Sequence, residues 1–277
     1  MNAHPRHVAA FAAALALMAC PAIAPGAYRD GSAVPAERLQ LPARLPQRTV
    51  DVPILMYHRI NVVDASTPAA SRGLTVHPDD FARQMAWLAR RGFRTITQRE
   101  LFDALFRGRS LGPRPILITF DDGYRDVFFR ASPVLKRLGF RATAYVVSGR
   151  ISNGDPSFLT WPLLRALEQR GIEIGSHTMR HADLTTLSPC HALADLVTSR
   201  RMLERKLGHP VQWLAYPFGR YSAQTEVLAR RAGYVLATTT QHGVRQSAAR
   251  PFALRRLRVL DTTGVRGLAA MLDAAGS

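Results

Sequence analysis

The stretch ILITFDDGY, residues 116–124, decides how the chain folds. An apolar run typical of a buried strand leads directly into two adjacent aspartates and a glycine. Unpaired carboxylates are costly at the end of such a strand. Asp121 and Asp122 therefore need partners from elsewhere in the chain, and the identity of those partners bears on function.

Further apolar runs along the chain predict strands, and the amphipathic segments between them predict helices. The chain has 277 residues, of which 47% are hydrophobic, enough for one substantial core in a single domain. Strands that alternate with helices predict a parallel α/β architecture, either a barrel or an open sheet. The eight predicted strands cover residues 52–58, 93–97, 115–121, 142–147, 172–177, 211–217, 234–240 and 254–260.

Residues 1–24 are typical of an export signal. The apolar stretch 8–19 follows a basic residue and is too short to span a bilayer comfortably. "LMAC" resembles the lipobox of bacterial lipoproteins, which would make Cys20 a lipid-modified residue that anchors the protein to a membrane. The alternative, cleavage after Ala24, would place a proline next to the cut. We therefore expect a protein exported to the periplasm or cell envelope.

The composition after this signal separates a linker from a folded domain. Residues 25–50 are rich in Pro, Ala and Arg and predict a linker, which leaves residues 51–277 for the domain. The formal net charge is +17, almost all from arginine. The basic residues are scattered and not interleaved with aromatics, so nucleic-acid binding is not predicted. Attraction to anionic polymers or lipid head groups is one explanation of the charge; compositional bias is the one we favour.

Side chains suited to metal binding stand where the predicted strands end, which is where functional residues gather in parallel α/β folds. His177 closes a predicted strand and His181 follows four residues later, a spacing that suits a divalent metal. A carboxylate from a neighbouring strand would complete the site. Asp121 and Asp122 can both serve it if the chain turns at Gly123, one as a ligand and the other as a proton acceptor. A pair of solvated helix histidines and a simple helix cap are the ordinary alternatives.

Three motifs in this order resemble those of the polysaccharide deacetylases, carbohydrate esterase family 4, which share the NodB-homology domain. They are TFDDG at 119–123, SHTMRHADL at 176–184 and YPFG at 216–219. The resemblance covers roughly residues 50–270 and implies a single domain folded as a distorted (β/α) barrel.

The same resemblance implies roles for individual residues. Asp121 would be the catalytic base, and Asp122, His177 and His181 would bind a divalent metal. In this family the metal is usually zinc, and sometimes cobalt or another divalent ion. The backbone N–H of Tyr216 would stabilise the oxyanion.

Two departures from the common family pattern matter. Ala215 stands where that pattern has an arginine, and the late catalytic histidine of an L-x-H motif has no clear copy. The opening PILMYHRI instead resembles the rearranged branch that includes deacetylases of poly-N-acetylglucosamine. By that resemblance, His58 supplies the acid and Arg256 replaces the missing arginine. His242, in TTQHG, is a second candidate for the acid.

The activity that the resemblance implies is hydrolysis of N-acetyl groups on an N-acetylglucosamine-containing polysaccharide, with release of acetate. An O-acetyl esterase acting on xylan or a similar polymer is one alternative, and a non-catalytic glycan-binding envelope protein is another. Tyr57 and Trp161 are weaker candidates for the walls of a sugar site. The sequence leaves open which polysaccharide is used and the oligomeric state.

Overall fold

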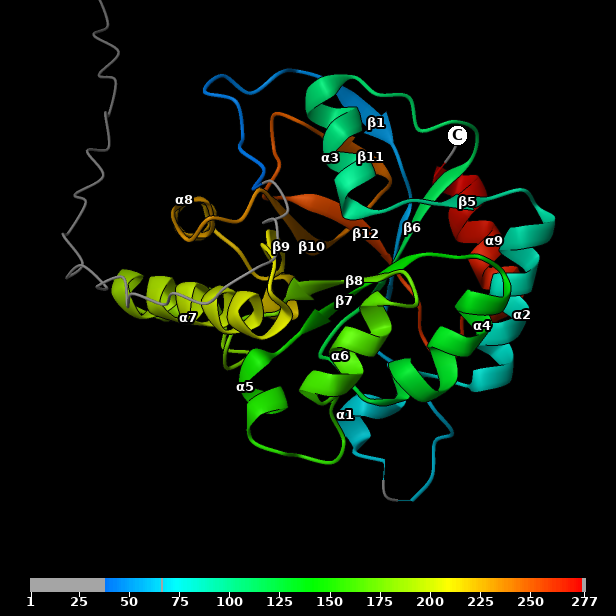
Figure 1. Ribbon diagram of the computed structural model, residues 1–277. Coiled ribbons are helices and arrows are strands. Elements are labelled where there is room, and N and C mark those ends of the chain that lie inside the picture. Colours follow the sequence, from blue (N-terminus) through cyan, green and yellow to red (C-terminus); the bar gives the residue numbers. More distant parts are fainter. Residues whose placement is uncertain (1–37, 66, 276–277) are drawn as a thin grey trace, which may run out of the picture. The chain divides into compact units, whose positions relative to one another are not determined.

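A closed barrel of parallel strands forms the centre of the computed structural model, which describes residues 38–65 and 67–275 (Figure 1). Among these residues, seven strands follow the order β2-β12-β10-β9-β8-β7-β6, and β6 pairs back with β2 to close the ring. The eighth strand, β5, pairs with β6 outside the ring. The prediction of a parallel (β/α) barrel is confirmed. The strands are β2 (Ile54–Tyr57), β5 (Arg94–Thr95), β6 (Pro115–Phe120), β7 (Ala142–Val146), β8 (Ile172–Ser176), β9 (Trp213–Ala215), β10 (Leu236–His242) and β12 (Leu254–Arg258).

Besides β5, four very short strands of the described chain lie outside the barrel, and none of these four was predicted. β1 pairs antiparallel with β11, and β3 pairs parallel with β4. Segments of two or three residues are too short to show an alternating pattern, so tertiary contacts decide their conformation. These strands are β1 (Thr49–Asp51), β3 (Arg59–Ile60), β4 (Thr75–Val76) and β11 (Arg245–Ser247).

Helices connect the strands and cover the barrel. In α2, Asp79 and Asp80 stand in the first turn, where the helix dipole favours negative charge. Phe81, Met85 and Leu88 of the same helix are fully buried at helical spacing, as predicted. The helices are α1 (Ala69–Arg72), α2 (Pro78–Arg90), α3 (Gln98–Arg107), α4 (Ser132–Arg137), α5 (Ser148–Ser152), α6 (Trp161–Glu168), α7 (Pro189–Leu207), α8 (Ala223–Arg231) and α9 (Gly264–Ala275).

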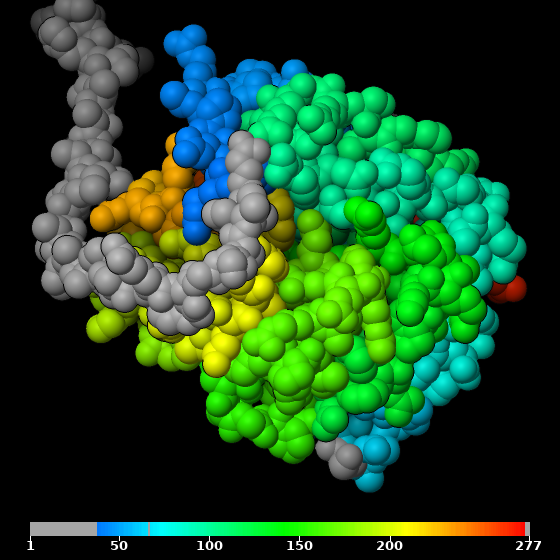
Figure 2. All heavy atoms as spheres, in the orientation of Figure 1, coloured from blue at the N-terminus to red at the C-terminus, as the bar shows by residue number. Residues whose placement is uncertain are grey.

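Strand β6 shows how the barrel positions the aspartates. Successive side chains of a strand point to opposite faces. Ile118 and Phe120 pack in one core cluster with residues of α2, α4 and α6, whereas Leu117 packs in a second cluster with residues of other barrel strands and of α3. Thr119 points to the same side as Leu117, since its hydroxyl accepts a hydrogen bond from a strand on the far side of β2. Asp121 continues this inner row. In the space-filling view, side chains of the surrounding elements hide most of the barrel (Figure 2).

The predicted linker differs from the structure over residues 38–50. Leu39 is buried, and its backbone N–H and carbonyl both hydrogen-bond the side-chain amide of Gln212, at 2.7 and 2.8 Å. This segment therefore belongs to the folded domain, which begins earlier than residue 51. The predicted signal, Cys20 and residues 25–37 lie outside the described residues. Within the described part of the chain, no helix combines the length and the apolar character needed to cross a membrane.

Candidate active site

A buried ion pair joins Asp121, after β6, to Arg256 on β12. Two guanidinium nitrogens of Arg256 donate to the two carboxylate oxygens of Asp121, at 2.8 and 2.7 Å. The Arg256 Nε donates to the Thr239 carbonyl at 2.8 Å, which fixes the orientation of the fork. Burial by itself raises the pKa of Asp121, but the charge and hydrogen bonds of Arg256 hold that pKa well below its usual range. Arg256 is thus the partner that keeps Asp121 ionised.

The carboxylate of Asp122 and the imidazoles of His177 and His181 converge beside this pair. Asp122 Oδ1 lies 3.8 Å from His177 Nε2 and 3.2 Å from His181 Nε2. One ligand atom from each of the three residues lies within 4.8 Å of the others. The two histidines follow β8 and Asp122 follows β6, so the predicted ligands do meet at the carboxyl ends of the barrel strands.

The loops that carry these residues have strained backbone. Of the five non-glycine residues with positive φ in the described chain, four belong to the site: Asp122, Thr178, His181 and Phe218. Such conformations cost on the order of 1–3 kcal/mol each and persist where the surroundings enforce them. At Asp122, a φ of 71° turns the chain away from the line of β6, so adjacent aspartates face different partners.

The hydrogen bonds of His177 test whether these residues fit a metal ion. Its Nδ1 lies 2.8 Å from the Ala215 carbonyl, which can only accept, so Nδ1 carries the proton. Burial lowers the pKa of His177 to about 4 despite the nearby Asp121 and Asp122 carboxylates, and the ring is therefore neutral near pH 7. Its Nε2 then carries a lone pair and lies 3.8 Å from Asp122 Oδ1, a buried atom with no hydrogen-bond partner in the described structure. A cation between them removes this repulsion, so the donor set fits a divalent metal.

His58, after β2, is partly buried on the same side of the barrel, and its Nδ1 atom is enclosed without a hydrogen-bond partner among the described residues. Burial lowers its pKa to about 4; Asp121 opposes this shift, and Arg256 and Arg258 add to it. His58 therefore shares the electrostatic environment of Asp121 and Arg256, as the sequence suggested.

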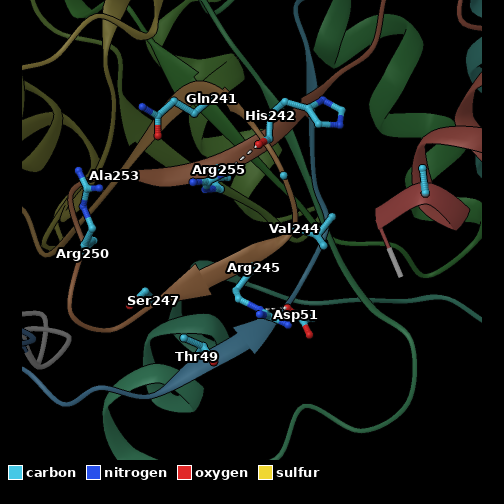
Figure 3. Close-up of a pocket in the computed structure, with 12 residues that line it drawn as sticks. Thr49, Asp51, Gln241, His242, Val244, Arg245, Ser247, Arg250, Ala253 and Arg255 are labelled. Atoms are coloured by element: carbon cyan, nitrogen blue, oxygen red, sulfur yellow. Dashed lines mark hydrogen bonds and ion pairs between the residues drawn. The ribbon is translucent and has the colours of Figure 1, made fainter. Parts of the chain in front are cut away.

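His242 lies elsewhere. It is exposed and lines a pocket of about 750 Å³ together with residues of β1 and β11 (Figure 3). Its carbonyl accepts a hydrogen bond from Arg255 at 3.2 Å. Among the described residues, no hydrogen bond or ion pair joins its ring to Asp121 or Asp122, so the geometry favours His58 over His242 as the acid.

The structure contradicts the role expected for Tyr216. Its backbone N–H donates to the Thr238 carbonyl at 3.1 Å, as part of the pairing of β9 with β10, and cannot also serve an oxyanion. Phe218, two residues later, has a φ of 59° and a ring 4.7 Å from that of His181. Among the hydrogen bonds of the described residues, none uses the Phe218 N–H as a donor. The motif YPFG contained a signal for this second N–H, because Phe218 directly follows its proline.

The two aromatic residues proposed as sugar walls belong to the core. Tyr57 is fully buried; its ring packs edge-on against Phe81, and its hydroxyl donates to Gln84 at 2.8 Å. Trp161 packs against the same core. The aromatic side chains near the site are instead Phe218 and Tyr124, which the sequence did not distinguish from ordinary loop residues.

Comparisons with known proteins agree with this geometry. The family model for polysaccharide deacetylases matches residues 108–237. The Bacillus subtilis (strain 168) protein YxkH, which carries the name of a polysaccharide deacetylase, is 32% identical over 213 residues, covering 77% of this chain and 73% of the relative. The chain belongs to the polysaccharide deacetylase family. The predicted family and its hydrolase class are therefore confirmed.

Two further relatives extend the comparison. The solved structure of the deacetylase PplD from Streptococcus pyogenes, in complex with acetate, superposes with a TM-score of 0.75 and 31% identity, over 81% of this chain and 99% of that one. A poly-β-1,6-N-acetyl-D-glucosamine N-deacetylase of Staphylococcus aureus (strain MRSA252) is 22% identical over 214 residues, covering 69% of this chain and 73% of the relative.

Proposed function

We propose that this polysaccharide deacetylase removes N-acetyl groups from an N-acetylglucosamine-containing polysaccharide and releases acetate. In this proposal Asp122, His177 and His181 hold a divalent metal, zinc in the first instance. The observation that carries it is the neutral His177, whose Nε2 bears a lone pair and lies 3.8 Å from the unpartnered Asp122 Oδ1. The name of the Staphylococcus aureus relative supports the choice of glycan.

The bound metal would polarise the acetyl carbonyl and lower the pKa of a water molecule to roughly 7. Asp121 is ionised and can accept the proton of that water. Its carboxylate keeps acceptor capacity beyond the two Arg256 bonds, because each oxygen carries two lone pairs. Arg256 thus fixes the orientation of the base as well as its charge.

His58 gives the proton to the departing nitrogen in this proposal. Because its pKa is about 4, the resting ring is neutral near pH 7 and must first gain a proton. The pKa of Asp121 lies lower still, so a proton that Asp121 accepts passes on readily to His58. A protonated His58 is then a strong acid for an amine that leaves only after protonation.

The Phe218 N–H takes the role of oxyanion donor that the Tyr216 N–H cannot fill. The strained turn of Phe218 places this residue against His181, one of the proposed ligands. We also retain as proposals that residues 1–24 direct export to the cell envelope and that Cys20 carries a lipid anchor.

Acetate release from N-acetylglucosamine polymers and from acetylated xylan, with and without a chelator, tests the activity. We expect release from the former, lost with chelator and restored by zinc. Asp122→Asn should lose the metal, whereas Asp121→Asn should keep it and lose turnover. Preference for acetylated xylan would identify an O-acetyl esterase instead, and full activity in metal-free protein would refute the mechanism.

Separate alanine variants of the two histidines test the identity of the acid. His58→Ala should lower kcat by about 10²- to 10⁴-fold with the metal content unchanged, because the leaving nitrogen loses its proton donor. His242→Ala should behave as the wild type, since His242 is exposed and lines a pocket to which none of the proposed site residues contributes. The reverse pattern of rates would show that His58 is not the acid.

A further inference from the structure

Arg150, on the short helix α5 that follows β7, lies beside the proposed metal ligand Asp122 and has no role in the mechanism above. Its Nη1 is 4.0 Å from Asp122 Oδ1. This distance is too long for a hydrogen bond. Among the hydrogen bonds of residues 38–65 and 67–275, none involves the guanidinium of Arg150. A positive charge therefore stands next to the site with its donors uncommitted.

An aromatic stack holds this guanidinium in place. Arg150 lies over the ring of Phe158 at 4.7 Å, and Phe158 stacks on Tyr124 at 4.9 Å with an interplanar angle of 21°. On the stack's other side, Arg59 lies over Tyr124 at 4.7 Å and pairs with Asp126 at 3.2 Å. The backbones of Tyr124 and Phe158 form a β-bridge, so the two rings are fixed relative to Asp122, the second residue before Tyr124. Arg150 is thus pre-positioned, which reduces the entropy lost when it binds a ligand.

Three other arginines around the site form ion pairs with acids that bind no metal in our proposal. Arg59 pairs with Asp126, Arg180 with Asp195 and Arg220 with Asp183. The carboxylate nearest to Arg150 is Asp122, whose Oδ1 also faces His177 and His181. If that oxygen binds a metal ion, the Asp122 carboxylate is shared between two cations, and the charge of Arg150 is only partly balanced.

We propose that Arg150 binds an anionic group, a carboxylate or a phosphate, carried by the glycan next to the N-acetyl group that is removed. The preferred substrate is then an N-acetylglucosamine-containing glycan that also carries negative charge. This inference rests on the proposed function, because it assigns a substrate class to the same site. A cation beside a dication is unfavourable unless an anion joins them, and the planar guanidinium fork suits carboxylate and phosphate. The net charge of +17 would also attract a polyanionic polymer.

Matched pairs of substrates test the proposal kinetically. One pair is an N-acetylated glycan fragment with a free carboxylate and its methyl ester; the other is a fragment with a phosphate and its dephosphorylated form. For the wild type, kcat/KM should favour the anionic member of one pair by about 10- to 100-fold, mainly through KM, as expected for a charge-assisted hydrogen bond. The pair that shows the preference identifies the anion.

Substitution of Arg150 then decides whether this residue is responsible. In Arg150→Gln the preference should fall to about 1. The control Arg125→Gln removes an exposed arginine that likewise lies over a phenylalanine ring, Phe129 at 5.2 Å, and should keep the preference. A wild type without preference, or an Arg150→Gln variant that retains it, would overturn the proposal. Equal losses of kcat/KM on the charged and the neutral fragment would also overturn it, because Arg150 would then bind neutral hydroxyl groups.

Binding provides a readout that does not depend on turnover. Calorimetry on zinc-loaded Asp121→Asn protein should show tighter binding of the anionic fragment than of its neutral counterpart, and Arg150→Gln in that background should abolish the difference. If the wild type releases acetate from no glycan, the proposed function fails, yet this difference still decides whether Arg150 recognises an anion. Equal affinities for the two fragments would refute the anion site.

Discussion

At the scale of single residues, the two adjacent aspartates show how different environments separate two identical side chains. Asp121 continues the inner row of β6 and forms a two-bond ion pair with Arg256, so its pKa is low. Asp122 turns out of that row with a positive φ and has an unpartnered oxygen, so burial raises its pKa. The first environment suits a carboxylate that remains charged, and the second suits one that awaits a cation.

The buried pair predicts a large effect on stability. Arg256→Met should lower the free energy of unfolding at pH 7 by about 3–5 kcal/mol, because it leaves Asp121 charged and buried without a partner. Urea denaturation of the metal-free protein measures this loss. The double variant Arg256→Met/Asp121→Asn should be more stable than Arg256→Met alone, since no unpaired charge remains.

An exposed pair provides the control for this experiment. Arg245 pairs with Asp51 at 3.1 Å at the surface, so Arg245→Met should change stability little. If Arg256→Met were no more destabilising than Arg245→Met, the Asp121–Arg256 pair would contribute little to the fold.

Side-chain chemistry in the sequence was sufficient to predict part of the site. Carboxylates and imidazoles at the ends of neighbouring parallel strands suit a metal site. The types and spacing of four residues therefore indicated the site: Asp121, Asp122, His177 and His181. Arg150 and Phe218 were not recognisable, because an arginine or a phenylalanine in a loop is usually a surface or packing residue. Their positions depend on a ring stack and a strained turn, which local sequence does not encode.

At the scale of elements, the turn after β6 positions the site. Gly123 has a φ of 82°, and its N–H donates to the Asp121 carbonyl at 3.0 Å. A Cβ added to Gly123 would lie 3.0 Å from the side chain of Val146 on β7. The close approach of β6 and β7 therefore requires glycine there for space as well as for conformation.

Gly123→Ala should consequently weaken both stability and metal binding. We expect a loss beyond the roughly 1–2 kcal/mol of left-handed strain, together with a lower zinc affinity as Asp122 shifts. Thermal unfolding and chelator competition measure the two effects. Gly139→Ala is the control, since Gly139 has a φ of 67° but open space around it; it should show the strain and no change in zinc affinity. Equal effects of the two substitutions would show that the contact with Val146 is unimportant.

Elements differed in how well the sequence predicted them. Most of the barrel strands are buried and rich in apolar residues, and each of the eight predicted runs contains a strand. What the runs could not show is that seven of them close a ring and β5 does not, because closure depends on the pairing of β2 with β6. The segment around Leu39 was taken for a linker because its composition is that of a loop, although a single side-chain amide fixes it to the domain.

At the scale of the whole molecule, buried neutral histidines make stability depend on pH. Burial lowers the pKa of His58 from an ordinary value of 6.5 to about 4, so between these values the unfolded chain binds a proton that the folded protein does not. The contribution is fully present above pH 6.5 and is lost as the pH falls toward 4. The slope for one such group is up to about 1.4 kcal/mol per pH unit.

His58→Gln should flatten this dependence in the metal-free protein. The free energy of unfolding of the wild type should fall faster between pH 6.5 and 4.5 than that of the variant. The two proteins must be compared because Glu173 also affects the pH dependence of unfolding. Burial raises the pKa of Glu173 to about 7, so its contribution to stability grows as the pH falls, in the wild type and in the variant alike. Parallel curves would mean that His58 titrates alike in the folded and unfolded states.

The ring order has a consequence for how the domain assembles. β2, near the start of the domain, fits between β6 and β12, and β12 is the last strand along the chain. Contacts that join segments so far apart form slowly, because the intervening chain must first be ordered. The proposed base, its arginine and the proposed acid come from the three strands that meet at this seam. In our proposal the catalytic residues therefore come together only when the first and the last strand of the barrel have paired, so we expect a chain still being synthesised to be an inactive precursor.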